Sequence, residues 1–371
     1  MRVLFLTRYP VEGASSRYRV YQYVPYLEEL GVSCEVQSFM DRKMYDLSLA
    51  KGRTVQKIYL TLLAIAKRIA ALTKHRQYDI IYMQRELFPL GGVVVERYLK
   101  KKGAVLCFDY DDALFIKKPS RYNSIATFFR SPTKTLDIFK VVDCVVAGNK
   151  WLQESAQKHG ARRAETIEVA EDVSRYILPE DRASRATVTI GWLGSPSTSK
   201  YLFEIEGALR RVASEFSDVR FLMVGGGELI MPGVPWVLRD WSLTGEVDAL
   251  AEIDIGLMPL PSEDWALGKS GGKARTYMAA GVVPICSAIG YNNELVVQGE
   301  TGCLCSSEEE WYSTIAELVQ SPGRREKMSA SARNYVIENF SVEDKASQMN
   351  RLFSDLVRRD EEGVTKAKAA D

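Results

Sequence analysis

The chain has 371 residues, a length comfortable for two domains, and its 46% hydrophobic and 26% charged residues are typical of a globular protein. Its formal net charge is +1, which argues against a general nucleic-acid-binding protein, because such proteins carry a strong basic excess. The six cysteines include no CxxC pair, so we expect buried, reduced thiols and no structural zinc site.

The N-terminal residues MRVLFLTRYP predict a strand and not a signal peptide, because the apolar run is short and no small-residue cleavage site follows. The longest uncharged stretch, IYLTLLAIA, is too short to span a bilayer. We therefore expect a cytoplasmic protein.

The first half of the chain alternates strand-like and helical segments. The run RVLFLT suits a buried parallel strand, and it leads through the loop RYPVEGASSRYRV to the helical segment YQYVPYLEELG, which Gly31 ends. Further strand-like runs are VSCEVQSF, YDIIYMQ, AVLCFDY and DCVVAG. This alternation predicts a doubly wound α/β domain over residues 1–180.

The same pattern starts again at TVTIGWLG, after a linker read in VSRYILPEDRASRA. A loop of small and hydroxyl residues, GSPSTSK, precedes the helical segment YLFEIEGALRRVASEF, and the strand-like runs VRFLMVGGG, IDIGLMPL and VVPICSA follow. The sequence thus predicts an α/β protein of two Rossmann-like domains, residues 1–180 and 187–345, facing each other across a cleft that holds the active site.

The end of the chain predicts an amphipathic helix over residues 341–359, with Ser341 as its N-cap, that is a candidate to cross back to the N-terminal domain. The polar tail, residues 360–371, is expected to be disordered.

Two loops of the second domain are candidates for binding a diphosphate. In GKSGGKARTYMAAG, Gly271 and Gly272 let backbone amides turn toward a ligand at a helix N-terminus, and Lys269 and Lys273 add positive charge. The earlier loop GSPSTSK offers three more residues: Gly194, Ser195 and Lys200. The alternative is a solvated turn with incidental lysines. The run VGGGEL does not complete a dinucleotide-binding GxGxxG pattern, because position 230 is isoleucine.

The segments IGWLGSPSTSKYL, IDIGLMPLP, GKSGGKARTYMAAGVVPICSAIGYNNELVVQGETGCL and REKMSASARNYVIENFS resemble the donor domain of GT-B glycosyltransferases, family 4 type, also called glycosyl transferases group 1. The resemblance runs from about residue 187 to 345, and the first half is similar more loosely, in GASSRYRVYQYVPYLEELGV, YMQRE, DYDDALF and VVDCVVAGNKWLQESA. It implies retaining transfer of a sugar from a nucleotide diphosphate sugar, in cell-surface polysaccharide or glycolipid synthesis. It also implies that no metal or other cofactor is needed, since lysines and helix dipoles neutralise the leaving diphosphate.

The resemblance also assigns donor-binding residues, with Lys200 and Lys269 acting on the leaving group. Those implied at the diphosphate are Gly194, Ser195, Lys200, Lys269, Ser270, Gly271 and Gly272. Lys273 is a further donor-binding candidate because of its charge in the same loop. Those implied at the base, and at the sugar and phosphates, are Arg239, Asp240, Trp241 and Glu294.

The chain departs from this family at two positions where many members carry glutamates that contact the sugar and the ribose. Those positions are Gly268 and Thr276 here. Thr276 could hold ribose hydroxyls only weakly, and Asp264 is a candidate to replace the other glutamate.

The acceptor is expected on the first domain, where FDYDDALF places Asp109, Asp111 and Asp112 at the end of a strand. These aspartates either cap the next helix, position an arginine, or orient and deprotonate an acceptor hydroxyl, and we favour Asp111 as the catalytic residue. The two histidines, His75 and His159, sit in polar turns and do not suggest a catalytic base. The other residues expected at the acceptor are Gly13, Ser15, Ser16, Arg17, Arg85, Glu86 and Asp109.

Residues 51–76 carry basic residues at both ends of an amphipathic helix. The segment either packs on its domain with a solvated basic face or makes a peripheral contact with an anionic membrane, which would suit a lipid-linked acceptor. Three further functions are alternatives to glycosyl transfer. Gly268 and Thr276 suggest a protein that binds a nucleotide sugar without transferring it. The positions of the histidines disfavour an epimerase, and the incomplete GxGxxG pattern disfavours an NAD-dependent oxidoreductase.

Overall fold

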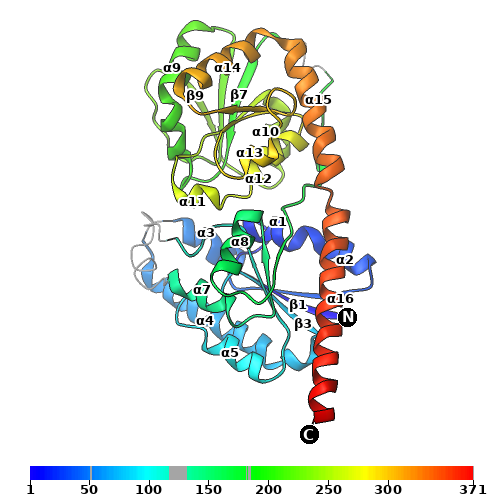
Figure 1. Cartoon of the computed structure of the whole chain (residues 1–371). Coiled ribbons are helices and arrows are strands. Elements are labelled where there is room, and N and C mark those ends of the chain that lie inside the picture. Colours follow the sequence, from blue (N-terminus) through cyan, green and yellow to red (C-terminus); the bar gives the residue numbers. More distant parts are fainter. Residues whose placement is uncertain (51, 117–131, 181, 183–184, 371) are drawn as a thin grey trace. The chain divides into compact units, whose positions relative to one another are not determined.

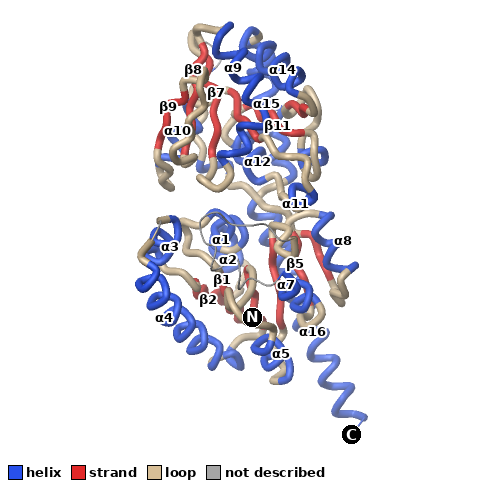
Figure 2. The backbone as a smooth tube through the Cα atoms, turned by 90° about the vertical axis from the view of Figure 1, so that its left-hand side faces the viewer, coloured by secondary structure: helices blue, strands red, loops and turns tan. Residues whose placement is uncertain are grey.

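The computed structural model describes residues 1–50, 52–116, 132–180, 182 and 185–370. The chain forms two compact units, one of Met1–Ala170 with Val342–Asp371 and one of Glu171–Ser341 (Figure 1). Each unit contains a parallel six-stranded sheet with helices packed against it (Figure 2). This is the two-domain α/β architecture expected from the sequence.

In the first unit the strand order is β2-β1-β3-β4-β5-β6. Alternate residues of each strand reach opposite faces, so Val3 and Phe5 pack with the C-terminal helix while Leu4 and Leu6 pack under other helices. The strands are β1 (Arg2–Thr7), β2 (Ser33–Ser38), β3 (Ile80–Gln84), β4 (Leu106–Tyr110), β5 (Cys144–Ala147) and β6 (Ala164–Thr166). The helices are α1 (Ala14–Arg19), η1 (Tyr21–Tyr23), α2 (Val24–Glu29), α3 (Arg42–Leu49), α4 (Thr54–Thr73), η2 (His75–Gln77), α5 (Val94–Lys101), α7 (Pro132–Phe139), α8 (Lys150–Lys158) and α16 (Val342–Ala370).

In the second unit the strand order is β12-β11-β10-β7-β8-β9. The strands are β7 (Val188–Leu193), β8 (Val219–Val224), β9 (Trp236–Arg239), β10 (Ile255–Met258), β11 (Val283–Ser287) and β12 (Cys303–Cys305). The helices are η3 (Val173–Arg175), η5 (Ser199–Ile205), α9 (Glu206–Glu215), α10 (Gly245–Glu252), α11 (Asp264–Leu267), α12 (Gly272–Ala279), α13 (Asn292–Leu295), α14 (Glu308–Gln320) and α15 (Pro322–Asn339).

The chain enters the second unit at Glu171, whose amide donates to the carbonyl of Phe340, and Tyr176 joins that unit's core. The expected limit of the first domain was residue 180, and part of the expected linker, residues 181 and 183–184, lies outside the described residues.

The C-terminal helix α16 belongs to the first unit, where Phe353 packs on Phe5 and Tyr82 at ring-centroid distances of 6.1 and 5.6 Å. It continues to Ala370, through residues 360–370 that we expected to be disordered. The repeated lysine, alanine and glutamate residues of this segment have high helix propensity, which accounts for the difference.

All six cysteines are free thiols, and five of them are buried. Among the described residues, no helix is both long enough and apolar enough to cross a membrane.

Candidate functional site

Each sheet has one position where the strand order reverses direction, and the loops beyond the carboxyl ends of the strands at that position are where ligands bind in such sheets. In the second unit the reversal falls between β7 and β10. The loop after β7 begins at Gly194, and the chain after β10 leads into α11 and α12. The two candidate diphosphate loops, 194–200 and 269–273, therefore flank this position.

The helix α12 is placed against the sheet by Tyr277. A side chain at Gly256 would meet the Tyr277 ring at 2.5 Å, so the missing side chain lets the ring lie on β10. The Tyr277 hydroxyl accepts a hydrogen bond of 2.9 Å from the amide of Leu193, the last residue of β7. These contacts of Tyr277 hold α12 against both central strands.

Two glycines shape the start of α12 in different ways. Gly271 is the N-cap and has φ +64°, and a side chain there would meet Leu295 at 2.7 Å and Tyr291 at 2.9 Å. Apart from the neighbouring residues and the backbone of α12 itself, no atom of the described residues lies within 4 Å of a Cβ placed on Gly272, so the space in front of it is open. The first amides of the helix can thus face a ligand, and the helix dipole favours an anion there.

Three lysines lie over aromatic rings at this edge of the sheet. The Nζ atoms of Lys200 and Lys269 are 5.4 Å from the ring centroids of Tyr201 and Trp265, respectively. These two rings are 5.3 Å apart, so they bring together lysines from the two candidate loops. The third, Lys273, has its Nζ 4.1 Å from the centroid of the buried Trp192. Among the described residues, neither Lys200 nor Lys273 forms an ion pair with a carboxylate.

The pKa of Lys273 is lowered to about 7, chiefly by burial and secondly by the positive charge of Lys269. A negative charge beside Lys273 would oppose this shift, because an anion favours the ammonium form.

Thr276 is buried, and its hydroxyl donates a hydrogen bond of 3.0 Å to Glu171 Oε2. The other oxygen of Glu171 accepts a hydrogen bond of 2.5 Å from the Tyr176 hydroxyl. Burial raises the pKa of Glu171 to about 7, although both hydrogen bonds oppose the shift. The structure therefore places a carboxylate beside Thr276 from a distant part of the chain, and the sequence analysis did not identify it.

Some of the remaining candidates for donor contacts are hydrogen-bonded to other side chains of the protein, and others are exposed. The Arg239 guanidinium forms two hydrogen bonds with Glu252, of 2.7 and 3.1 Å, and Trp241 Nε1 donates to Glu246 at 2.6 Å. The exposed members of the set are Ser195, Asp240, Asp264 and Glu294, while Ser270 is buried and its carbonyl accepts from Arg275 at 2.9 Å. The structure thus brings together the diphosphate candidates, whereas the side chains of Arg239 and Trp241 hold their own loop.

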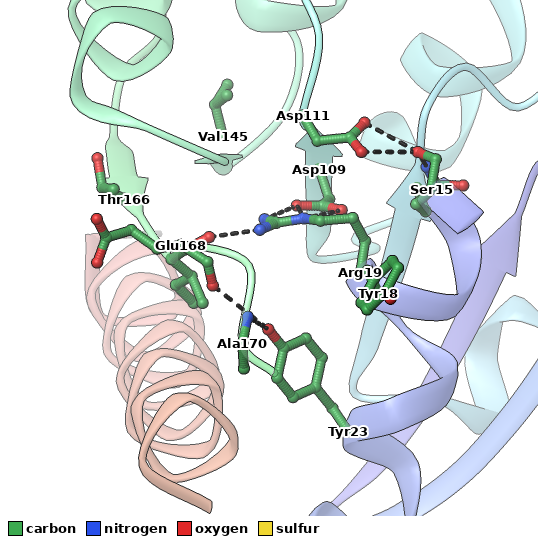
Figure 3. A network of polar contacts seen from close by, with 12 residues as sticks. Ser15, Tyr18, Arg19, Tyr23, Asp109, Asp111, Val145, Thr166, Glu168 and Ala170 are labelled. Carbon is green, nitrogen blue, oxygen red and sulfur yellow. Dashed lines mark hydrogen bonds and ion pairs between the residues drawn. The ribbon is translucent and has the colours of Figure 1, made fainter. Parts of the chain in front are cut away.

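In the first unit the strand order reverses between β1 and β3. Gln84, the last residue of β3, links the two serines of α1: its Nε2 donates to Ser15 Oγ at 2.9 Å, and its Oε1 accepts from Ser16 Oγ at 2.8 Å. Ser15 Oγ in turn lies 2.9 Å from both carboxylate oxygens of Asp111 (Figure 3). Ser15, Ser16 and Asp111 therefore form one connected group at the edge where an acceptor was expected.

Asp109 is paired with a buried arginine. It is fully buried, and its carboxylate pairs with Arg19, whose Nε lies 3.0 and 3.1 Å from the two carboxylate oxygens (Figure 3). Burial lowers the pKa of Arg19, but the charge and hydrogen bonds of Asp109 offset this and raise it above its ordinary value. Arg19 also donates to the carbonyl of Ile167 at 2.5 Å. Asp109 therefore holds Arg19 in place, which is one of the roles expected for this group of aspartates.

Arg85 follows β3 with φ +68°, an unusual conformation for a residue with a side chain. Its guanidinium donates to the Tyr9 hydroxyl at 3.1 Å and lies 3.7 Å from Asp112 Oδ2. Burial lowers its pKa, but Tyr9 and nearby carboxylates, Asp111 among them, raise it above the ordinary value. A charged arginine is thus held beside the Ser15–Asp111 group.

Three more acceptor candidates make contacts within the first unit itself. A side chain at Gly13 would meet Tyr9 Cβ at 2.3 Å, and the buried Arg17 donates to the carbonyls of Val11 and Glu12 at 3.4 and 3.2 Å. Glu86 accepts from Thr135 Oγ1 at 3.5 Å.

Residues 186–321 match the sequence profile of the family described as Glycosyl transferases group 1. No curated protein sequence shows significant similarity to the chain. Solved structures with the same fold include sucrose-phosphate synthase from Thermosynechococcus elongatus (15% identity, TM-score 0.69, covering 97% of this chain and 100% of that one). They also include Anabaena HepE in complex with UDP-glucose (16%, 0.70, 96% and 100%) and a glycosyltransferase from Rickettsia africae (17%, 0.68, 96% and 98%). The likeness shows that the two units together have the GT-B fold.

Proposed function

We propose that this chain, which has the GT-B fold and carries a group 1 glycosyltransferase domain in its second unit, transfers a sugar from a nucleotide diphosphate sugar to a hydroxyl acceptor with retention of anomeric configuration. The observation that carries the proposal is the convergence of Lys200, Lys269 and Lys273 with the open N-terminus of α12. The structure of HepE with UDP-glucose is consistent with a donor of this class.

The proposed donor site acts on the leaving group. When the bond from the anomeric carbon to the diphosphate breaks, negative charge accumulates on the departing oxygen. Lysine ammonium groups and helix amides fixed in place stabilise that charge without reorganising, and one such donor contributes roughly 10²–10³ in rate. We propose that these cations make a metal ion unnecessary. Asp264 and Glu294, both exposed, are proposed to contact the sugar.

The first unit is proposed to bind the acceptor, a glycan or a lipid-linked glycan of cell-surface polysaccharide or glycolipid synthesis on the cytoplasmic side of the membrane. Asp111 accepts from Ser15 and lies near the charged Arg85. A carboxylate in this position can orient an acceptor hydroxyl and take up its proton as the new bond forms.

A second candidate function is nucleotide-sugar binding without transfer, and it is favoured by the absence of glutamates at Gly268 and Thr276. On this view the site would hold a donor with its basic edge, but would not activate it. An epimerase reaction is a weaker third candidate. The two described histidines bind carbonyls of their own helix ends, His75 to Leu72 and His159 to Ser155.

One assay distinguishes sugar transfer from binding without transfer. The protein is incubated with a panel of UDP-, GDP- and ADP-sugars, and both nucleotide release and donor binding are measured. We expect release with at least one donor, reduced roughly 100-fold in Lys269→Ala and unchanged in Lys327→Ala, which removes an exposed lysine elsewhere on the same unit. Binding without release in the presence of a range of glycan acceptors would support the alternative. Absence of both binding and release would reject the proposal.

A further inference from the structure

The helix α4 carries apolar side chains on its buried side and on an exposed side. One side packs into the first unit through Ala64 and Leu72. Large apolar side chains on the other side are exposed, with Val55 82%, Ile58 56% and Leu62 61% accessible. These positions recur with helical spacing, and Tyr59 and Ile69 extend the row. A helix on the surface of a globular protein normally turns its polar face outward, so this row suggests a partner that is itself apolar.

Positive charge accompanies the apolar row. Residues 47–78 contain seven lysines and arginines and no aspartate or glutamate, in a chain whose totals, 49 basic and 48 acidic residues, nearly cancel. Arg68 is buried and donates to the carbonyl of Thr7 at 2.6 Å, and Lys51 lies outside the described residues. Lys67, Lys74 and Arg76 are exposed along the C-terminal half of the segment. The apolar row is thus bordered by cations with no acidic residue between them.

An open pocket of about 750 Å³ lies where α3 meets the start of α4. Its charged lining residues among those that the structure describes are Arg42, Lys43, Asp46 and Arg53, an excess of two positive charges. Arg42 is 77% exposed, and its pairing with Glu12, at 3.7 Å, is loose. Arg53 is the N-cap of α4 and has φ +53°, a costly conformation for a residue with a side chain. The pocket is therefore a basic cavity that opens at the end of the exposed apolar row.

We propose that α3 and α4, which lie together at one edge of the first unit (Figure 2), dock this protein on an anionic lipid bilayer. The row of Val55, Ile58 and Leu62 enters the boundary between headgroups and acyl chains, and the pocket receives lipid phosphates. A helix with an apolar face and a basic border lies in the membrane interface in this way. In this proposal α4 lies at the membrane surface, and no described helix is long and apolar enough to cross a membrane.

A bilayer fits this surface better than a second copy of the chain does. Two copies meeting through α4 would bring the basic borders together, because residues 47–78 have no carboxylate to offer the partner. Like charges facing each other across an interface oppose association, whereas an anionic lipid surface attracts each nearby lysine or arginine. The inference goes beyond the transfer reaction and does not depend on it.

The test is cosedimentation of the full-length protein with vesicles of phosphatidylcholine containing roughly 30% phosphatidylglycerol, compared with pure phosphatidylcholine. We expect binding to the anionic vesicles only, weakened by salt. The variant Arg42→Gln, Lys43→Gln, Arg53→Gln should bind roughly 100-fold more weakly, from a contribution of about 1 kcal/mol per cation. The control Lys150→Gln, Lys158→Gln, Lys327→Gln changes net charge equally at exposed lysines of α8 and α15, and should bind as the wild type does.

A second pair of variants tests the apolar row. Ile58→Ser with Leu62→Ser should lower binding at least tenfold. Ile230→Ser with Val237→Ser, which removes two exposed apolar side chains of the second unit, should not. Circular dichroism and thermal unfolding verify that each variant is folded. The proposal is overturned if the wild type does not bind anionic vesicles, or if the control lysine variant loses as much binding as the pocket variant. It is also overturned if sedimentation velocity without lipid shows a dimer that Leu62→Ser dissolves. Neither donor nor acceptor is present, so failure here leaves the proposed transferase activity untouched.

Discussion

The lowered pKa of Lys273 predicts that donor affinity falls as pH rises. With a pKa of about 7, the free site carries the charged lysine in about nine-tenths of molecules at pH 6 and in about one-hundredth at pH 9. If only the charged form binds a diphosphate, apparent affinity scales with that fraction, so the Kd should rise roughly 100-fold, about 2.7 kcal/mol, across this range. The sign follows from proton uptake: a bound anion stabilises the ammonium form, and higher pH opposes its formation.

The measurement is isothermal titration calorimetry of a UDP-sugar, whose diphosphate does not titrate between pH 6 and pH 9. Repeating each titration in buffers of different ionisation enthalpy counts the protons taken up, with about one proton expected per donor bound near pH 8. Lys273→Arg keeps its charge at every pH and should flatten the profile at high affinity, and Lys273→Met should flatten it at low affinity. A wild-type affinity that does not change with pH, or an arginine variant that keeps the slope, would refute the reasoning.

Four further predictions follow from the contacts described above. Because the pKa of Glu171 is raised from 4.5 to about 7, the folded state keeps a proton that the unfolded state releases between these pH values. The free energy of unfolding should therefore fall by about 3 kcal/mol as pH rises from 4.5 to 7, and Glu171→Gln should remove this pH dependence in chemical denaturation. Gly271→Ala should cost roughly 1–2 kcal/mol in stability because of its positive φ and its contact with Leu295, whereas Gly272→Ala should leave stability intact and weaken donor binding about tenfold, by calorimetry. Asp109→Asn should destabilise the protein by about 3–5 kcal/mol by leaving Arg19 buried without its partner, whereas Asp111→Asn should change stability by less than about 1 kcal/mol and lower transfer about 100-fold. Turnover should be unchanged by EDTA, and a loss that Mg²⁺ or Mn²⁺ restores would contradict the metal-free leaving-group mechanism.

The parts of this fold that the sequence predicts are those in which local pattern and tertiary environment agree. Runs such as RVLFLT and TVTIGWLG are apolar throughout because parallel strands are covered on both faces, and they appear as β1 and β7. The loop at Gly271 is also recognisable, because glycine tolerates the positive φ that this N-cap adopts.

The contacts that local pattern does not predict join distant parts of the chain. Glu171 meets Thr276 across 105 positions, and Asp109 meets Arg19 across 90. Strand alternation does not distinguish Asp109 from Asp111, because residues two apart share a face. What separates them is the end of the strand: Asp109 lies within β4, and Asp111 follows it. The aromatic rings under Lys200 and Lys269 give no such signal, because their contact depends on how two loops meet.

The most direct test of the donor site is a crystal structure of the protein with bound UDP. We predict that the diphosphate lies within hydrogen-bonding distance of the amides of Gly272 and Lys273, with the ammonium group of Lys269 or Lys273 beside it. The account would be contradicted by a diphosphate bound elsewhere on the second unit. In that structure Lys200, Lys269 and Lys273 would still contact their aromatic rings, and only water would lie at the start of α12.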